Sequence, residues 1–154
     1  MNNLMTRDDL THPETDCDVL IVEDDPAQAE ELAYSLSRAG LAVQVLHCGS
    51  EALHRVSEIR PRIALLDYNL PDLDGVTVAE RIRRLSPETA MLMMSGRIDG
   101  LPEPTLRRVG LYSFMNKPVH PGRLLSSVRR MVKAAAKTGL PAVRPYKWLG
   151  ISFD

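Results

Sequence analysis

Residues 63–75 read IALLDYNLPDLDG, and this stretch decides the fold. Four apolar residues are followed by Asp67 and then by a turn rich in Asn, Pro, Asp and Gly. A short apolar run bounded by turn residues is typical of a buried strand. In open parallel α/β sheets, ligands bind outside the carboxyl ends of the strands, so we expect Asp67 at the functional edge of a sheet.

Three other short stretches also end in polar side chains. DVLIVEDDP at 18–26 ends in Asp24 and Asp25, MLMMSG at 91–96 carries Ser95, and FMNKPV at 114–119 carries Lys117. Carboxylates brought together at one edge repel one another and raise the pKa of at least one of them. A hard cation with oxygen ligands is the simplest neutraliser, so the sequence predicts a metal site beside an acceptor carboxylate, a hydroxyl and an ammonium.

From about Asp18 to Lys137, in order and in spacing, these residues resemble the receiver domain of two-component response regulators. The resemblance implies that Asp67 is the phosphoacceptor and that Asp24 and Asp25 are the acidic pair that holds Mg²⁺. It implies that Lys117 meets the phosphoryl group, whose charge must be balanced by fixed cations.

The resemblance also assigns residues around this centre. Asn69 contributes its backbone carbonyl to the metal, and the Lys117–Pro118 bond is cis. Ser95 and Phe114 form the switch, in which the hydroxyl moves to the phosphoryl group and the ring turns inward. Phe114 lacks a hydroxyl, so a permanently buried core ring is the alternative for that position.

The fold class predicted is α/β, a doubly wound five-stranded parallel sheet, flavodoxin-like, with strand order 2-1-3-4-5 and helices on both faces. Strands are expected at about 18–22, 41–46, 63–67, 89–94 and 111–115. Helices are expected at about 26–39, 50–59, from 75, at 103–109 and at 120–137. Ser50 or Gly49 is expected to cap the second helix, and prolines keep the helix at 103–109 short.

The length of 154 residues suits one domain, and no apolar run approaches the roughly 20 residues of a membrane span. We expect residues 1–16 to form a flexible arm, 17–137 the receiver domain and 138–154 an apolar and basic tail. The first sixteen residues lack the layout of a signal peptide, which favours a cytoplasmic location without membrane contact.

Charge is distributed unevenly along the chain. Residues 1–100 carry 18 acidic and 9 basic residues, a balance of −9, whereas residues 101–154 carry 2 acidic and 10 basic residues, a balance of +8. The basic part is either a solvated helix face or a docking surface for an acidic partner. The lack of a recognition-helix motif argues against nucleic acid as a partner.

The tail holds three of the seven aromatic residues within its last nine positions. Its apolar side chains alternate with small or polar residues, a pattern typical of a strand. We expect it to dock in extended form on the region 103–109 or on a second subunit, the alternative being a disordered remnant. The docking residues would be Tyr146, Trp148, Leu149, Ile151 and Phe153.

The function expected is therefore phosphoryl acceptance on Asp67 from a histidine kinase or a histidine phosphotransfer protein. The protein would not be an enzyme beyond self-phosphorylation and autodephosphorylation. It would signal to a downstream protein target, or through a homodimer, by the face made of residues 103–109, 111–115 and 120–137 and by the tail.

Two alternatives remain. One is an aspartate-nucleophile phosphohydrolase, which needs an acid where Asn69 stands. The other is an interaction module that works without phosphorylation.

Overall fold

The computed structural model of the chain describes residues 17–96, 104 and 108–138. The flexible arm expected at 1–16, most of the short helix expected at 103–109, and the tail residues Tyr146, Trp148, Leu149, Ile151 and Phe153 lie outside the described residues. Predictions about these segments stay predictions.

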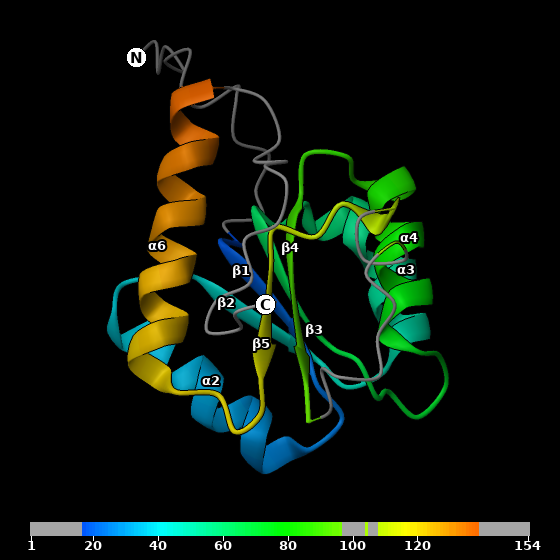
Figure 1. The fold of residues 1–154 in the computed structure, drawn as a ribbon, viewed down its shortest axis with the longest axis horizontal. Coiled ribbons are helices and arrows are strands. Elements are labelled where there is room, and N and C mark those ends of the chain that lie inside the picture. Colours follow the sequence, from blue (N-terminus) through cyan, green and yellow to red (C-terminus); the bar gives the residue numbers. More distant parts are fainter. Residues whose placement is uncertain (1–16, 97–103, 105–107, 139–154) are drawn as a thin grey trace, which may run out of the picture.

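The described part of the chain builds one parallel sheet (Figure 1). Its five strands are β1 (Val19–Val22), β2 (Val43–Leu46), β3 (Ile63–Asp67), β4 (Ala90–Ser95) and β5 (Ser113–Asn116). Their order is β2-β1-β3-β4-β5, and every pair of neighbours is parallel. The predicted fold class and strand order are confirmed.

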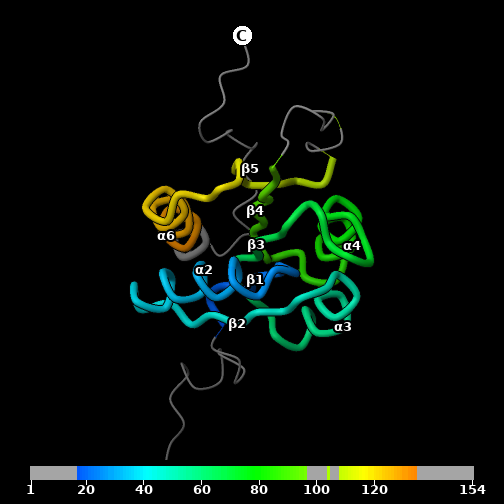
Figure 2. Tube along the Cα trace, turned by 90° about the horizontal axis from the view of Figure 1, so that it is seen from below, coloured from blue at the N-terminus to red at the C-terminus, as the bar shows by residue number. Residues whose placement is uncertain are grey.

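Helices cover both faces of this sheet, as Figure 2 shows. On one face lie α2 (Pro26–Arg38) and α6 (Pro121–Thr138), and on the other lie α3 (Gly49–Ile59) and α4 (Gly75–Leu85). None of the helices in the described ranges is long and apolar enough to cross a membrane.

The central strands bury side chains on both faces, as expected for a parallel sheet between two helical layers. Successive side chains alternate between two apolar clusters because a strand has a period of two. The cluster under α3 and α4 includes Leu20, Val22, Ala64, Leu66, Met91 and Met93. The cluster under α2 and α6 includes Val19, Ile21, Ile63, Leu65, Leu92 and Met94. Two packed layers therefore fix the strand ends at which the predicted site residues stand.

The start of α3 differs from the prediction. Cys48 occupies the N-cap position and makes no side-chain cap bond there. The carboxylate of Asp72, from the turn after β3, accepts the backbone N–H of Gly49 at 2.8 Å and that of Ser50 at 2.7 Å. A Cβ on Gly49 would lie 2.7 Å from Cγ2 of Val78. The expected cap by Ser50 or Gly49 is therefore wrong, because a distant loop supplies it.

The last strand and helix lead to the site. β5 begins two residues later than expected, and the Lys117–Pro118 bond that follows it is cis, as the resemblance implied. Leu124, Val128 and Met131 of α6 are buried against the sheet.

Candidate acidic site at the carboxyl edge of the sheet

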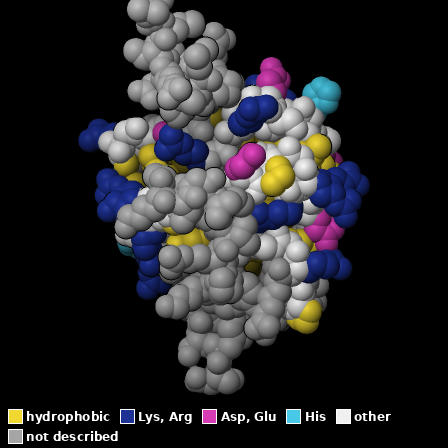
Figure 3. Space-filling model, turned by 90° about the horizontal axis from the view of Figure 1, so that it is seen from above, with side chains coloured by type: hydrophobic (Ala, Val, Ile, Leu, Met, Phe, Trp, Pro, Cys, Tyr) yellow, Lys and Arg dark blue, Asp and Glu magenta, His cyan; other side chains and the backbone are white. Residues whose placement is uncertain are grey.

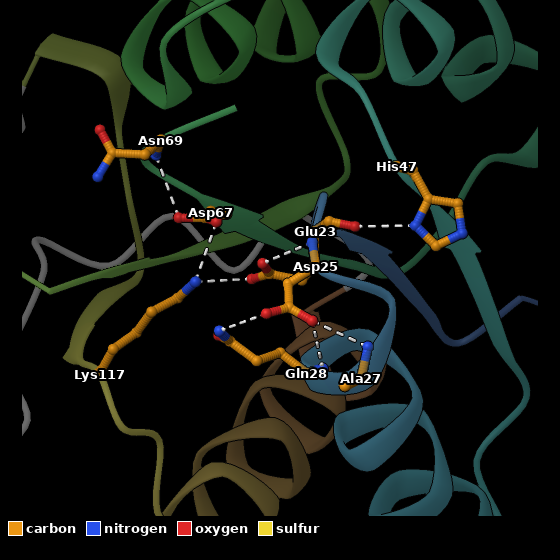
Figure 4. A network of polar contacts seen from close by, with 8 residues as sticks. All are labelled: Glu23, Asp25, Ala27, Gln28, His47, Asp67, Asn69 and Lys117. Carbon is orange, nitrogen blue, oxygen red and sulfur yellow. Dashed lines mark hydrogen bonds and ion pairs between the residues drawn. The ribbon is translucent and has the colours of Figure 1, made fainter. Parts of the chain in front are cut away.

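The parallel register brings Glu23 and Asp67 together at one edge of the sheet. Val22 of β1 pairs with Leu66 of β3. The residues that follow them, Glu23 and Asp67, therefore stand side by side. Both residues are buried, with 1% and 4% of their surface exposed. Figure 4 shows them pointing toward Lys117, which follows β5.

Lys117 is ion-paired with both carboxylates. Its Nζ donates to Oε2 of Glu23 at 2.8 Å and to Oδ2 of Asp67 at 2.9 Å. Burial lowers the pKa of Lys117, but the bonds to Glu23 and Asp67 outweigh burial, and the net pKa is raised. Burial raises the pKa of Glu23 to about 7, with a further contribution from the Asp67 charge and opposition from Lys117. One ammonium therefore does not neutralise this group of acids.

A third carboxylate completes the group. Oxygen atoms of Glu23, Asp24 and Asp67 all lie within 4.8 Å of one another, and Asp24 is exposed. Carboxylate oxygens are the ligands that hard divalent cations prefer. The predicted acidic cluster at this edge is present, but its membership differs from the prediction by one residue.

Asp25, predicted to hold the metal with Asp24, has another role in the structure. It is the N-cap of α2, where its Oδ1 accepts the backbone N–H of Ala27 at 2.9 Å and of Gln28 at 3.3 Å. Its Oδ2 accepts Nε2 of Gln28 at 3.1 Å. These bonds, led by the one from the Gln28 backbone, lower the pKa of Asp25. Glu23 takes the place in the acidic group that was predicted for Asp25.

The signal for Glu23 was present in the sequence. Glu23 directly follows the apolar residues of β1. In the same way, Asp67 directly follows the apolar residues of β3. Asp24 and Asp25 separate Glu23 from Pro26, and an aspartate immediately before a helix that starts with proline is a preferred N-cap. Counting from the strand rather than from the proline identifies Glu23.

The turn after Asp67 packs tightly against the backbone of this residue. Oδ1 of Asp67 accepts the N–H of Asn69 at 3.1 Å, and the N–H of Gly75 donates to the Tyr68 carbonyl at 2.7 Å. A Cβ on Gly75 would lie 2.7 Å from Cα of Tyr68 and 2.8 Å from the carbonyl oxygen of Asp67. The loop geometry therefore depends on glycine, while metal ligation by the Asn69 carbonyl stays a prediction.

The two predicted switch residues occupy neighbouring strands. Ser95 is buried at the end of β4, and its carbonyl accepts the N–H of Lys117 at 2.8 Å. Phe114 of β5 is buried in the cluster under α3 and α4, so its ring already lies inside the protein. Movement of either side chain stays a prediction.

His47, for which no role was predicted, contacts the site. Its Nδ1 lies 3.0 Å from the carbonyl oxygen of Glu23. Since a carbonyl can only accept, this bond requires a proton on Nδ1. His47 directly follows β2, the neighbour of β1, and in this way it fixes the backbone of Glu23.

A groove opens beside Lys117, between α2 and the turn that leads to α6. Its volume is about 500 Å³. It is lined by Gln28, Glu31, Leu32, Ser35, Lys117, Pro118, Val119 and Pro121. Lys117 is thus reachable from the side of α2.

Comparison with known proteins agrees with this arrangement. Residues 19–129 match the response regulator receiver domain family. The chain is 34% identical over 121 residues to the transcriptional regulatory protein CseB of Streptomyces coelicolor, an alignment that covers 79% of this chain and 51% of that protein. It is 32% identical over 115 residues to the DNA-binding response regulator MtrA of Mycolicibacterium smegmatis. This alignment covers 75% of this chain and 50% of that protein.

A solved structure of a receiver domain has the same fold. The CheY-like response regulator receiver domain protein of Methanospirillum hungatei superposes with a TM-score of 0.74 and 26% identity, covering 77% of this chain and 95% of that one. The chain spans about half the length of the curated relatives that it matches. Because these relatives include DNA-binding and transcriptional regulators, the expectation against nucleic acid loses its support. The chain belongs to the response regulator receiver domain family.

Proposed function

We propose that this receiver takes a phosphoryl group on Asp67 from a histidine kinase or a histidine phosphotransfer protein. The observation that carries the proposal is the contact of 2.9 Å between Nζ of Lys117 and Oδ2 of the buried Asp67. A carboxylate oxygen of Asp67 attacks phosphorus, the P–N bond to the donor imidazole breaks, and an aspartyl phosphate forms. Lys117 then balances charge on the transferred group.

The donor set fits Mg²⁺, because three carboxylates converge within 4.8 Å of one another with one ammonium to balance them. Glu23, Asp24, Asp67 and the backbone carbonyl of Asn69 would hold the ion. When bound, Mg²⁺ supplies electrostatic stabilisation of the phosphoryl oxygens. Lys117 keeps its bond to Glu23 as an anchor while its ammonium faces the reacting oxygen of Asp67.

The groove beside Lys117 is the proposed docking place of the phosphodonor protein. Leu32, Val119 and Pro121 give it apolar walls, and Gln28 and Ser35 add hydrogen-bonding groups. A donor seated there reaches the ammonium without crossing the α3 and α4 side of the sheet. An apolar groove with a few polar groups is typical of a recognition site.

Output is proposed to leave through β5 and α6. The exposed charged side chains of the described part of α6 are all cationic: Arg123, Arg129, Arg130 and Lys133. None of them forms an ion pair with an acid in the described ranges. Figure 3 shows dark blue side chains along the edge of the molecule that α6 forms. An acidic surface on a downstream protein, or on a second copy of the chain, would complement this face.

Ser95 and Phe114 would connect the two events. Ser95 ends β4 at the site, and Phe114 lies on β5 three residues before Lys117. A phosphoryl group on Asp67 would attract the Ser95 hydroxyl, and the space that this movement leaves would bias the Phe114 ring. Phosphorylation then changes the face that carries the cations of α6.

The test is incubation of the full chain with acetyl phosphate and Mg²⁺, followed by intact-mass measurement. We expect one phosphoryl group on the parent and none on Asp67→Asn. Asp74→Asn is the matched control, because Asp74 lies in the same turn but caps α4 through the backbone N–H of Thr77. Equal labelling of the parent and Asp67→Asn would refute the proposal, and sustained turnover of a phosphate ester would favour a phosphohydrolase.

A further inference from the structure

The first turn of α6 is capped by an imidazole. Nδ1 of His120 accepts the backbone N–H of Gly122 at 3.1 Å and that of Arg123 at 3.4 Å. The carbonyl of His120 accepts the N–H of Leu124 at 3.0 Å, the first bond of the helical ladder. His120 is therefore the N-cap residue of α6 by both its side chain and its backbone.

Histidine is an unusual choice for this position, where Ser, Thr, Asp and Asn are preferred. The N-caps of α2 and α4 in this chain are aspartates, Asp25 and Asp74. A carboxylate accepts hydrogen bonds whenever it is ionised, across the neutral pH range. Imidazole accepts at Nδ1 only in the neutral form that carries its proton on Nε2. The α6 cap is thus the one of these three in which protonation turns the accepting atom into a donor.

The sequence after His120 accommodates the ring. A Cβ on Gly122 would lie 3.1 Å from Cε1 and 3.3 Å from Nδ1 of His120, which is closer than ordinary van der Waals contact. Pro121 occupies the first helical position, where a missing N–H costs nothing. The glycine disfavours the helix by itself, so its presence is explained by the space that the imidazole needs.

The cap lies at one end of the turn that carries Lys117. The other end is held by the bond from the Lys117 N–H to the Ser95 carbonyl. Between these two points run Pro118 and Val119, which line the groove together with Lys117. Closing the N-terminus of α6 therefore limits how far the backbone of Lys117 can move.

We propose that His120 is a positioning residue for Lys117, and that it acts only while its imidazole is neutral. Protonation replaces the acceptor with a donor and puts a positive charge at the positive end of the helix dipole, so the cap opens as pH falls. The charged residues nearest to His120 in the sequence are Lys117 on the turn and Arg123 on α6, and Glu31 of α2 lines the groove together with Lys117. The effect on phosphoryl uptake rests on the proposed function, whereas the opening of the cap does not.

Two readouts on the full chain test the two parts separately. The first is the protection of the Gly122 and Arg123 amides against hydrogen exchange, corrected for intrinsic rates, between pH 8 and pH 5. We expect protection in the parent to fall about fivefold as the imidazole is protonated, which is the typical effect of a lost cap. His120→Asn, a cap that does not titrate, should keep protection constant, and His120→Ala should lack it throughout.

The second readout is the rate of labelling of Asp67 by acetyl phosphate over the same pH range. The ratio of the rates at pH 8 and pH 5 should be larger in the parent than in His120→Asn, because both share every other titration. A matched check uses Gly122→Ala. In the His120→Asn chain this substitution should raise amide protection, because alanine favours the helix more than glycine does. In the parent it should not raise amide protection, because the new methyl group crowds the imidazole ring.

Each outcome decides one part. Protection in the parent that does not change with pH, or changes equally in His120→Asn, would overturn the titrating cap. A titrating cap with equal rate ratios in the two chains would overturn the positioning of Lys117. Absence of labelling in the parent at every pH would overturn the proposed function and the positioning role, while the exchange data would still decide the cap.

Discussion

Two turns at the same edge of the sheet use their acidic residues in the same two ways. In the β1–α2 turn, Glu23 is buried at the strand end and pairs with Lys117, and Asp25 caps the following helix. In the β3–α4 turn, Asp67 is buried at the strand end and pairs with the same lysine, and Asp74 caps the following helix. The backbone position, more than the residue type, decides what a carboxylate does here.

The physical difference lies in the available partners. A carboxylate at a helix N-terminus meets unsatisfied N–H groups, which stabilise its charge. A carboxylate at the end of a buried strand faces its counterparts on neighbouring strands, so its charge requires a cation. The capping set is therefore satisfied within the protein, and the strand-end set is the one that can bind an ion.

The largest expected difference is in Mg²⁺ affinity between matched substitutions in the first turn. We expect Glu23→Gln to weaken Mg²⁺ binding by roughly one to two orders of magnitude, because it removes one carboxylate of the converging group. Asp25→Asn should leave the affinity within about a factor of two, since asparagine is also a good cap. Isothermal titration with Mg²⁺ measures both. Equal losses in the two variants would show that Asp25 belongs to the metal site after all.

A smaller effect is expected from the glycine that follows the second turn. Gly75→Ala should destabilise the fold by about 1 to 2 kcal/mol, because the new Cβ meets the backbone of Tyr68 and Asp67 at 2.7 and 2.8 Å. Gly96→Ala is the control, since a Cβ at Gly96 meets nothing within 4 Å. Urea unfolding gives both values. Similar midpoints for the two variants would mean that the turn tolerates the methyl group and does not press on Asp67.

Much of the fold and part of the site could be predicted from the sequence. The apolar runs of β1, β3 and β4 identify buried strands, and Asp67 and Lys117 stand at or directly after strand ends, where register places them. The prediction paired Asp25 with Asp24, whereas the structure groups Glu23 with Asp24 and Asp67; three consecutive acids follow β1, and only Glu23 lies directly after the strand. The cap of α3 by Asp72 could not be predicted, because it joins residues 22 positions or more apart through a loop.

The smallest effect concerns Asp72, the acid of the second turn that caps a helix other than its own. Bonds from the backbone and side chain of Ser50, with a further one from the Gly49 N–H, lower the pKa of Asp72 to about 2. Because the pKa is lower in the folded state than in the unfolded state, the carboxylate stabilises the fold above about pH 4. This contribution decreases as pH falls toward 2. Among the described residues, no acid of the β1–α2 turn caps a helix other than α2.

We therefore expect Asp72→Asn to destabilise the chain by about 0.5 to 1 kcal/mol at pH 7, since one amide oxygen replaces two carboxylate oxygens and the exposed site is screened by water. The difference from the parent should shrink as pH falls from about 4 toward 2, because the unfolded chain takes up the proton first and the folded carboxylate follows only near its pKa of about 2. Urea unfolding at pH 7 and pH 3 measures this change. Glu51→Gln is the control, because Glu51 also lies in the first turn of α3, but its side chain bonds no backbone group in the described part of the chain. A difference that is equal at both pH values, or one that Glu51→Gln reproduces, would show that the loop does not cap α3 through its charge.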